Sequence, residues 1–158
     1  MNRKYEFTGE EKLFYGRTLK RIKAKISFGN VVQGEVGGWI EKEENLSEYD
    51  DAWVYGNAEV YGNAEVYGNA EVCGDAEVCG DAWVIKTRHT ISFTKVGSRN
   101  DTLTAFRTKT GFSIKIGCFL GSLELFLEKV QETHGDNQFA KEYRLIAEVI
   151  KARFEVEE

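Results

Sequence analysis

The sequence predicts a mainly β protein with a smaller α+β part. We expect a short solenoid of parallel strands between an N-terminal β cap and a C-terminal domain of three strands and two helices. A six-residue unit such as Ala-Glu-Val-Tyr-Gly-Asn repeats through the middle of the chain. Apolar and basic side chains alternate before it, and strand-like runs followed by two segments of helical periodicity come after it. The predicted parts are residues 1–33, 34–86 and 87–158.

The central repeats predict very short strands with a turn after each one. Alternation places Ala and Val on one face and Glu and Tyr on the other, and Gly-Asn or Gly-Asp then turns the chain. A glycine in every unit, at about 1 kcal/mol each, excludes a helix. Six residues are also too few for the two strands and two turns of a hairpin meander. Three units would close a triangular coil of 18 residues, with six valines inside it: Val54, Val60, Val66, Val72, Val78 and Val84.

Stacking of such coils would place residues that are 18 positions apart in register, so that Glu59 lies over Glu77. Cys73 and Cys79 would lie on different sides of the triangle and would not bond to each other. With Cys118 they make an odd number of cysteines, which favours free thiols over a disulfide framework.

The outward side of the repeats predicts a contact surface. Aromatic rings alternate there with carboxylates, and exposed aromatics between acids suit binding or self-association. The alternative is that the tyrosines occur only because aromatic residues favour strands. The candidate partner-binding residues are Trp53, Tyr55, Glu59, Tyr61, Glu65, Tyr67, Glu71, Glu77 and Trp83.

The charge distribution indicates the kind of partner. Residues 1–26 carry eight basic and three acidic side chains, whereas residues 27–85 carry one lysine and thirteen acids. Because the acidic middle repels phosphate, direct nucleic-acid binding by the repeats is not expected. A basic protein suits it better, including one whose basic face normally holds nucleic acid. The alternative is an acidic surface that is only solvated.

The two ends predict the cap and the second domain. The segment 17–26 alternates as a strand does, and residues 5–7 and 13–15 are expected to pair with it. Runs at 91–96, 103–108 and 112–119 predict three strands. Ser122 is placed to cap a helix that reaches about residue 133, Gly135 to end it, and Asp136 to cap a second helix.

The repeats resemble the left-handed β-helix of hexapeptide-repeat transferases, because all six units from Ala52 to Val84 have a small residue, any residue and then valine. That resemblance implies left-handed coiling. The blocks GEVGGWIEKEENLSEYDDAWVYGNA, VGSRNDTLTAF, GCFLGSLELFLEKV and ETHGD resemble a family of phage and prophage proteins in which a variable number of hexapeptides lies between similar ends. This second resemblance implies a phage protein.

Catalysis is not expected. Hexapeptide acyltransferases use a histidine of the coil region, and residues 1–88 contain none. Cys118, His134 and Asp136 form the remaining candidate set, as thiol, base and orienter. The competing interpretation makes Cys118 a core residue of a strand and the other two an ordinary helix–helix joint. No cofactor is expected, and no metal either, because the cysteine spacing differs from that of zinc sites.

We therefore predict a non-enzymatic, phage-encoded binding protein. It would use the acidic and aromatic face and the C-terminal domain to bind a protein partner, such as a CRISPR effector or another host defence component. The alternatives are a homo-oligomeric phage assembly protein, dimeric or trimeric, and an enzyme built on Cys118 and His134. Without an apolar run of about 20 residues or a signal-peptide core, we expect no membrane contact and a place in the bacterial host cytoplasm.

Overall fold

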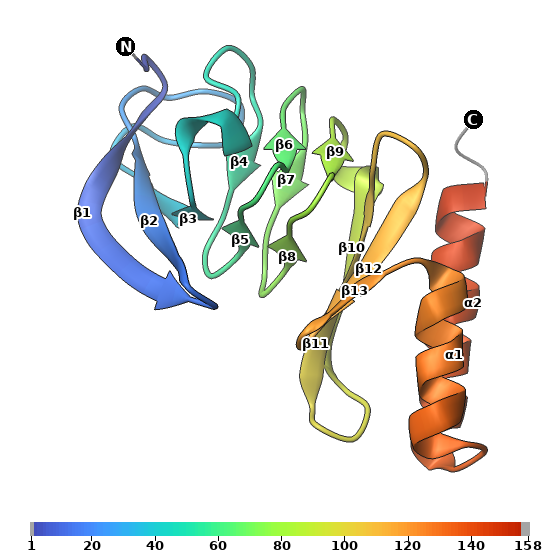
Figure 1. The fold of residues 1–158 in the computed structure, drawn as a ribbon. Coiled ribbons are helices and arrows are strands. Elements are labelled where there is room, and N and C mark those ends of the chain that lie inside the picture. Colours follow the sequence, from blue (N-terminus) through green and yellow to red (C-terminus); the bar gives the residue numbers. More distant parts are fainter. Residues whose placement is uncertain (1, 156–158) are drawn as a thin grey trace.

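The computed structural model describes residues 2–155. An N-terminal hairpin, the repeat strands, an antiparallel sheet and two helices follow one another along the molecule (Figure 1). The strands are β1 (Tyr5–Phe14), β2 (Arg17–Ala24), β3 (Val36–Ile40), β4 (Trp53–Val54), β5 (Glu59–Val60), β6 (Glu65–Val66), β7 (Glu71–Val72), β8 (Glu77–Val78), β9 (Trp83–Val84), β10 (Thr90–Val96), β11 (Asp101–Arg107), β12 (Phe112–Ile116) and β13 (Phe119–Gly121). The helices are α1 (Leu123–His134) and α2 (Gln138–Glu155), with single 3₁₀ turns η1 (Glu43–Asn45) and η2 (Thr87–His89).

The predicted left-handed parallel β-helix is wrong. Within residues 2–155 the parallel strands are distributed over three small sheets and form neither one continuous coil nor a closed sheet. One sheet has the order β1-β2-β3-β5-β8, whereas β4 pairs with β7 and β6 pairs with β9 in sheets of two strands. Each repeat gives only two strand residues before its turn begins, so the hydrogen-bonded ladders stay short and separate. The fold is therefore a mixture of small sheets with two helices.

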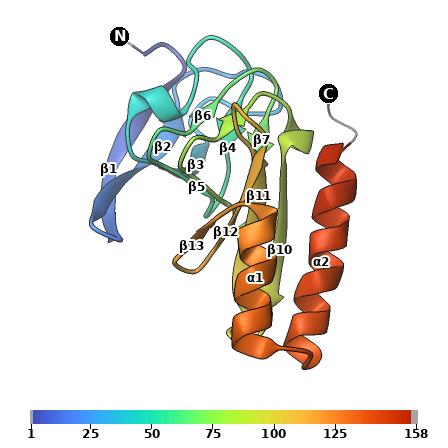
Figure 2. The ribbon, with the colours of Figure 1, turned by 45° about the vertical axis from the view of Figure 1, so that its right-hand side comes forward.

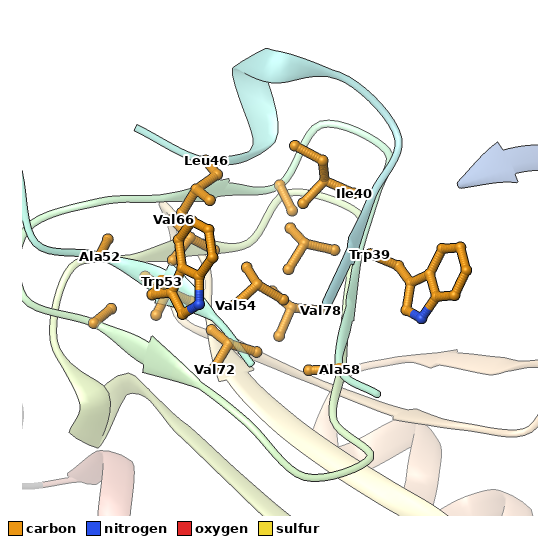
Figure 3. Close-up of a cluster of buried hydrophobic side chains, with 14 of the residues drawn as sticks. Trp39, Ile40, Leu46, Ala52, Trp53, Val54, Ala58, Val66, Val72 and Val78 are labelled. Atoms are coloured by element: carbon orange, nitrogen blue, oxygen red, sulfur yellow. The ribbon is translucent and has the colours of Figure 1, made fainter. Parts of the chain in front are cut away.

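The spacing of 18 residues is nevertheless confirmed within these sheets. Glu59 pairs with Glu77 and Trp53 with Glu71, both in parallel. The repeat valines are at most 1% exposed and gather in one core (Figure 3). Burying each of these side chains contributes about 1.5–3 kcal/mol. The glycines of the Gly-Asn and Gly-Asp turns have φ from 55° to 71°, a left-handed conformation that glycine adopts without strain.

A lysine side chain closes the N-terminal end of the stacked strands. Between stacked repeats, an N–H of one unit donates to an alanine carbonyl of a later unit, as Trp53 N does to Ala70 O at 3.1 Å. The carbonyl of Ala52 has no earlier repeat above it, and Lys4 Nζ donates to it at 2.6 Å. The same ammonium donates to Asp50 O at 3.0 Å. Lys4 thus takes the place of a missing strand.

The buried amide of Asn45 closes a second side of the same end. Its Nδ2 donates to Gly62 O at 3.2 Å and to Ala64 O at 2.9 Å. Its Oδ1 accepts from the backbone N–H groups of Glu41 and Lys42, at 3.1 and 3.0 Å. One side chain therefore satisfies four backbone groups.

Two threonines serve the opposite end of the stack. Thr87 Oγ1 accepts from Glu71 N at 3.0 Å, and Thr104 Oγ1 accepts from Glu77 N at 3.0 Å. Open backbone donors of the last repeats are thereby paired, as buried polar groups require. Hydroxyl acceptors at this end complement the side-chain donors at the other.

The burial of Lys4 predicts a pH dependence of stability. Burial lowers the pKa of Lys4 to about 8 from 10.5, against the opposing effect of Asp50. Between these values the unfolded chain binds more protons than the folded chain, so the free energy of unfolding should rise with pH, by up to about 3 kcal/mol. Urea titrations across this range should show a steeper rise for the wild type than for Lys4→Met. Parallel curves for the two proteins would contradict the assignment.

The antiparallel sheet contains four strands and not the predicted three. The predicted strand 112–119 is interrupted by a turn at Gly117, whose φ is 54°. The chain reverses there, and Phe119 in β13 pairs with Ile116 in β12. Cys118 therefore lies exposed in the turn rather than in a buried strand as predicted.

The two helices begin and end nearly where the sequence predicts. Ser122 accepts a hydrogen bond from the first turn of α1 at 3.2 Å, and Gly135, with φ of 58°, ends that helix. The predicted cap of α2 is off by one position, because Asn137 Oδ1, and not Asp136, accepts from Ala140 N at 2.9 Å. Neither helix in residues 2–155 is long and apolar enough to cross a membrane.

The antiparallel sheet lies between the repeats and the helices (Figures 1 and 2). Leu103 and Ala105 of β11 pack with the helices, whereas Phe106 belongs to the core of the repeats. Successive residues of a strand point to opposite faces, so β11 is buried on both sides. The predicted division of the chain after residue 86 stays a prediction.

Candidate functional site

Three of the nine predicted contact residues are not on the surface, which corrects the prediction of a fully outward lattice. Trp53 is fully buried, with its ring centroid 6.2 Å from that of Tyr5 and 5.3 Å from that of Phe28. Glu59 is 8% exposed and Tyr61 is 6% exposed. The physical reason is coverage: the N-terminal segment lies over the outer faces of these repeats.

A further predicted contact, Glu77, joins two parts of the fold. The hydroxyl of Tyr61 donates to Glu77 Oε2 at 2.9 Å, and Lys115 Nζ lies 3.5 Å from the same oxygen. Burial, and then the nearby Cys79 and Glu77, raise the pKa of Tyr61, so that its hydroxyl stays protonated. Lys12 pairs with Glu59 in a similar way, although burial raises the pKa of that carboxyl. These carboxylates hold the fold together.

The other five predicted contact residues are half-buried: Tyr55, Glu65, Tyr67, Glu71 and Trp83. On the β6–β9 side, the ring centroids of Tyr67 and Trp83 are 6.2 Å apart. Burial, and secondarily Glu65, raise the pKa of Tyr67, which keeps its hydroxyl a hydrogen-bond donor. This side is the part of the predicted surface that adjoins a groove.

The groove has two adjoining hollows, of about 570 and 500 Å³, and both contain Glu44 and Glu65. We call them together the acidic groove. The first hollow is lined by Asn2, Glu43, Glu44, Leu46, Ser47, Glu48, Tyr49, Glu65, Val66 and Tyr67. The second is lined by Lys42, Glu44, Asn63, Ala64, Glu65, Asp81 and Lys109. Five carboxylates thus face two lysines.

Local hydrogen bonding brings the segment 43–49 to this groove. Leu46 forms a parallel bridge with Val66, and Ser47 N donates to Val66 O at 2.9 Å, so η1 and the following loop lie beside β6 (Figure 1). Tyr49 then projects into solvent with 90% of its surface exposed. The sequence analysis missed this segment as a site, although the acid-rich run EKEENLSEYDD was the signal for it.

The chemistry of the groove suits cations that are carried on flexible side chains. Arginine and lysine are attracted to the faces of aromatic rings, and arginine forms paired hydrogen bonds with carboxylates. The groove offers both, with Tyr49 and Tyr67 next to Glu44, Glu48 and Glu65. Only Glu65 already has a lysine partner, Lys109, at 3.2 Å.

The predicted catalytic set is not assembled. Cys118 and His134 line one small cavity, but Asp136 does not, and its side chain is 89% exposed and pairs with Arg144 at 3.3 Å. The His134 ring instead stacks on Tyr143, with centroids 5.8 Å apart. All three cysteines are free thiols, and residues 2–155 bring no three His, Cys, Asp or Glu side chains together as a metal site.

Comparison with models of protein families and with curated proteins finds no match for this chain. The resemblances to hexapeptide-repeat proteins and to phage proteins therefore remain predictions from sequence. Function has to be inferred from the acidic groove and the side chains that line it.

Proposed function

We propose that this protein is a binding protein whose acidic groove holds a basic segment of a protein partner. The observation that carries the proposal is the coincidence of hollow shape, unpaired carboxylates and an exposed aromatic ring on one side of the repeats. Glu44 is exposed and has no ion pair within residues 2–155, and Tyr49 beside it is 90% exposed. Burying such a ring against a partner is a typical source of binding energy.

The size and charge of the groove define the partner further. Hollows of about 500–570 Å³ fall within the range of binding sites and hold a few side chains rather than a folded domain. The carboxylates repel the phosphates of nucleic acid and attract arginine and lysine. A partner with a protruding basic loop or tail fits both properties.

The resemblance to phage proteins extends the proposal to a source of that partner. A phage protein acts in the cytoplasm of its bacterial host, and a host defence protein that binds nucleic acid has a basic surface. Occupying that surface with an acidic groove would block the nucleic acid. This step rests on the resemblance and on charge complementarity, and binding itself requires only the groove.

Reversing two groove charges should weaken binding to an arginine-rich peptide at least tenfold. The variant Glu44→Lys/Glu65→Lys changes the acids shared by both hollows. The control, Glu124→Lys/Glu128→Lys, makes the same change in net charge on α1, where both side chains are exposed. Because long-range attraction depends on net charge and contact on position, the control should lose less than about threefold. Titration calorimetry at low and moderate salt measures both.

Equal weakening by the two variants would show that net charge alone acts, and would refute the groove. Tyr49→Ala supplies a second measurement without a change in charge, and it should also weaken binding. In host lysate, the same protein should be retained by the wild type and the α1 control and be lost with the groove variant. Retention by all three would likewise refute the proposal.

A further inference from the structure

A second site lies at the far end of the molecule from the N-terminal hairpin. A cavity of about 190 Å³ is enclosed by the β10–β11 turn, the β12–β13 turn, the second half of α1 and one side chain of α2. The β10–β11 turn and the end of α1 both lie at the lower end of the views in Figures 1 and 2. Its wall is apolar and aromatic, formed by Ile116, Phe119, Phe126, Val130 and Tyr143.

Two cations flank this apolar wall without a protein partner. Arg99, from the β10–β11 turn, and Lys129, from α1, both line the cavity. Neither forms an ion pair or a side-chain hydrogen bond with any residue of the described range 2–155. Asp101 is the one carboxylate in the lining, so the cavity has an excess of positive charge with His134 neutral. A cation pair beside an apolar wall attracts an anion that also has an apolar body.

The aromatic rings indicate the shape of that body. Phe126 meets Tyr143 edge to face with centroids 5.7 Å apart, and Phe119 lies 5.9 Å from Phe126 in a tilted arrangement. Rings in such arrangements accept another ring against a free face or edge. A dry cavity of about 150 Å³ holds one benzene, and a volume of about 190 Å³ leaves room for one small substituent.

We propose that this cavity binds a small organic anion with a single aromatic ring, of the aryl carboxylate class. The ring packs on Phe119 and Phe126, and the carboxylate reaches Arg99 and Lys129 at the mouth. This site is independent of the acidic groove, which has the opposite charge and lies on another part of the fold. Cys118 borders the cavity and is exposed, so it can report occupancy without taking part in binding.

Protection of Cys118 tests the proposal with benzoate as the probe. In a Cys73→Ser background, Cys118 is the one exposed thiol, because Cys79 is only 3% exposed. Saturating benzoate should slow alkylation of Cys118 by iodoacetamide at least about fivefold. Arg99→Gln/Lys129→Gln should raise the benzoate concentration for half-protection roughly tenfold, whereas Lys141→Gln, an exposed lysine on α2, should leave it unchanged.

Two further probes separate charge from shape. Inorganic phosphate has the charge without the ring, and benzyl alcohol has the ring without the charge, so each should protect at least about tenfold less well than benzoate. Equal protection by benzyl alcohol, equal protection in the Arg99→Gln/Lys129→Gln variant, or no protection by benzoate would each overturn the proposal. Amide shifts at Gly117 and Thr133 on adding benzoate should locate the site, and shifts confined to other residues would also refute it.

Discussion

Gly38→Ala should destabilise the protein by about 3 kcal/mol or more, through the addition of one methyl group. A Cβ at Gly38 would lie 2.6 Å from Ala58 O and 2.8 Å from Val54 Cγ1. Carbon atoms do not approach so closely, and neither neighbour can move freely, because one is backbone and the other is in the core (Figure 3). Strand β3 would have to separate from β5, to which it is hydrogen-bonded.

Urea unfolding followed by circular dichroism measures this effect, with Gly111→Ala as the matched control. A Cβ at Gly111 would meet nothing within 4 Å, and Gly111 does not have a positive φ. The control should therefore change the free energy of unfolding by no more than about 0.5 kcal/mol. Similar stabilities for the two variants would show that β3 does not pack on the repeats as closely as described.

Asn45→Ala should cost about 3–4 kcal/mol, because it leaves four backbone groups without their partner. Asn45 is fully buried, and each orphaned buried donor or acceptor costs about 1–3 kcal/mol, with some relief where water enters beside Lys42. Asn45→Asp should be similarly damaging, since a carboxylate would then face the carbonyls of Gly62 and Ala64. The measurement is again urea unfolding.

Asn63→Ala provides the control for this position. Asn63 has an exposed side chain in the Gly-Asn turn of a repeat and makes no side-chain hydrogen bond within the described residues. Its loss should change stability by less than about 0.5 kcal/mol. If Asn45→Ala were no more harmful than Asn63→Ala, Asn45 would not be the cap of the first repeats.

Local periodicity was sufficient to predict the interior of the repeats. Alternation within four residues determines which side chains face inward, so the burial of Val60 and Val78 and the pairing of Glu59 with Glu77 follow from sequence. The cap of α1 at Ser122 is equally local. The predicted β-helix went wrong because periodicity does not determine how far each hydrogen-bonded ladder extends or which other strands join it.

The outer side of the repeats depends on contacts that are distant in sequence. Trp53 was expected outside, but Tyr5 and Phe28 cover it from segments more than twenty residues away. The acidic groove likewise needs the loop after η1 to meet β6, which no single repeat encodes. Tyr49, the most exposed aromatic of that groove, lies outside the regular repeat and was therefore not selected.

The paired ends of the stack restrict how this chain can change in length. Lys4 meets Ala52 at one end, and Thr87 and Thr104 meet Glu71 and Glu77 at the other. Inserting a single hexapeptide would shift the strands by one third of the period and present each terminal side chain to the wrong backbone group. Three hexapeptides together restore every pairing, so viable insertions and deletions in this lineage should come in steps of 18 residues.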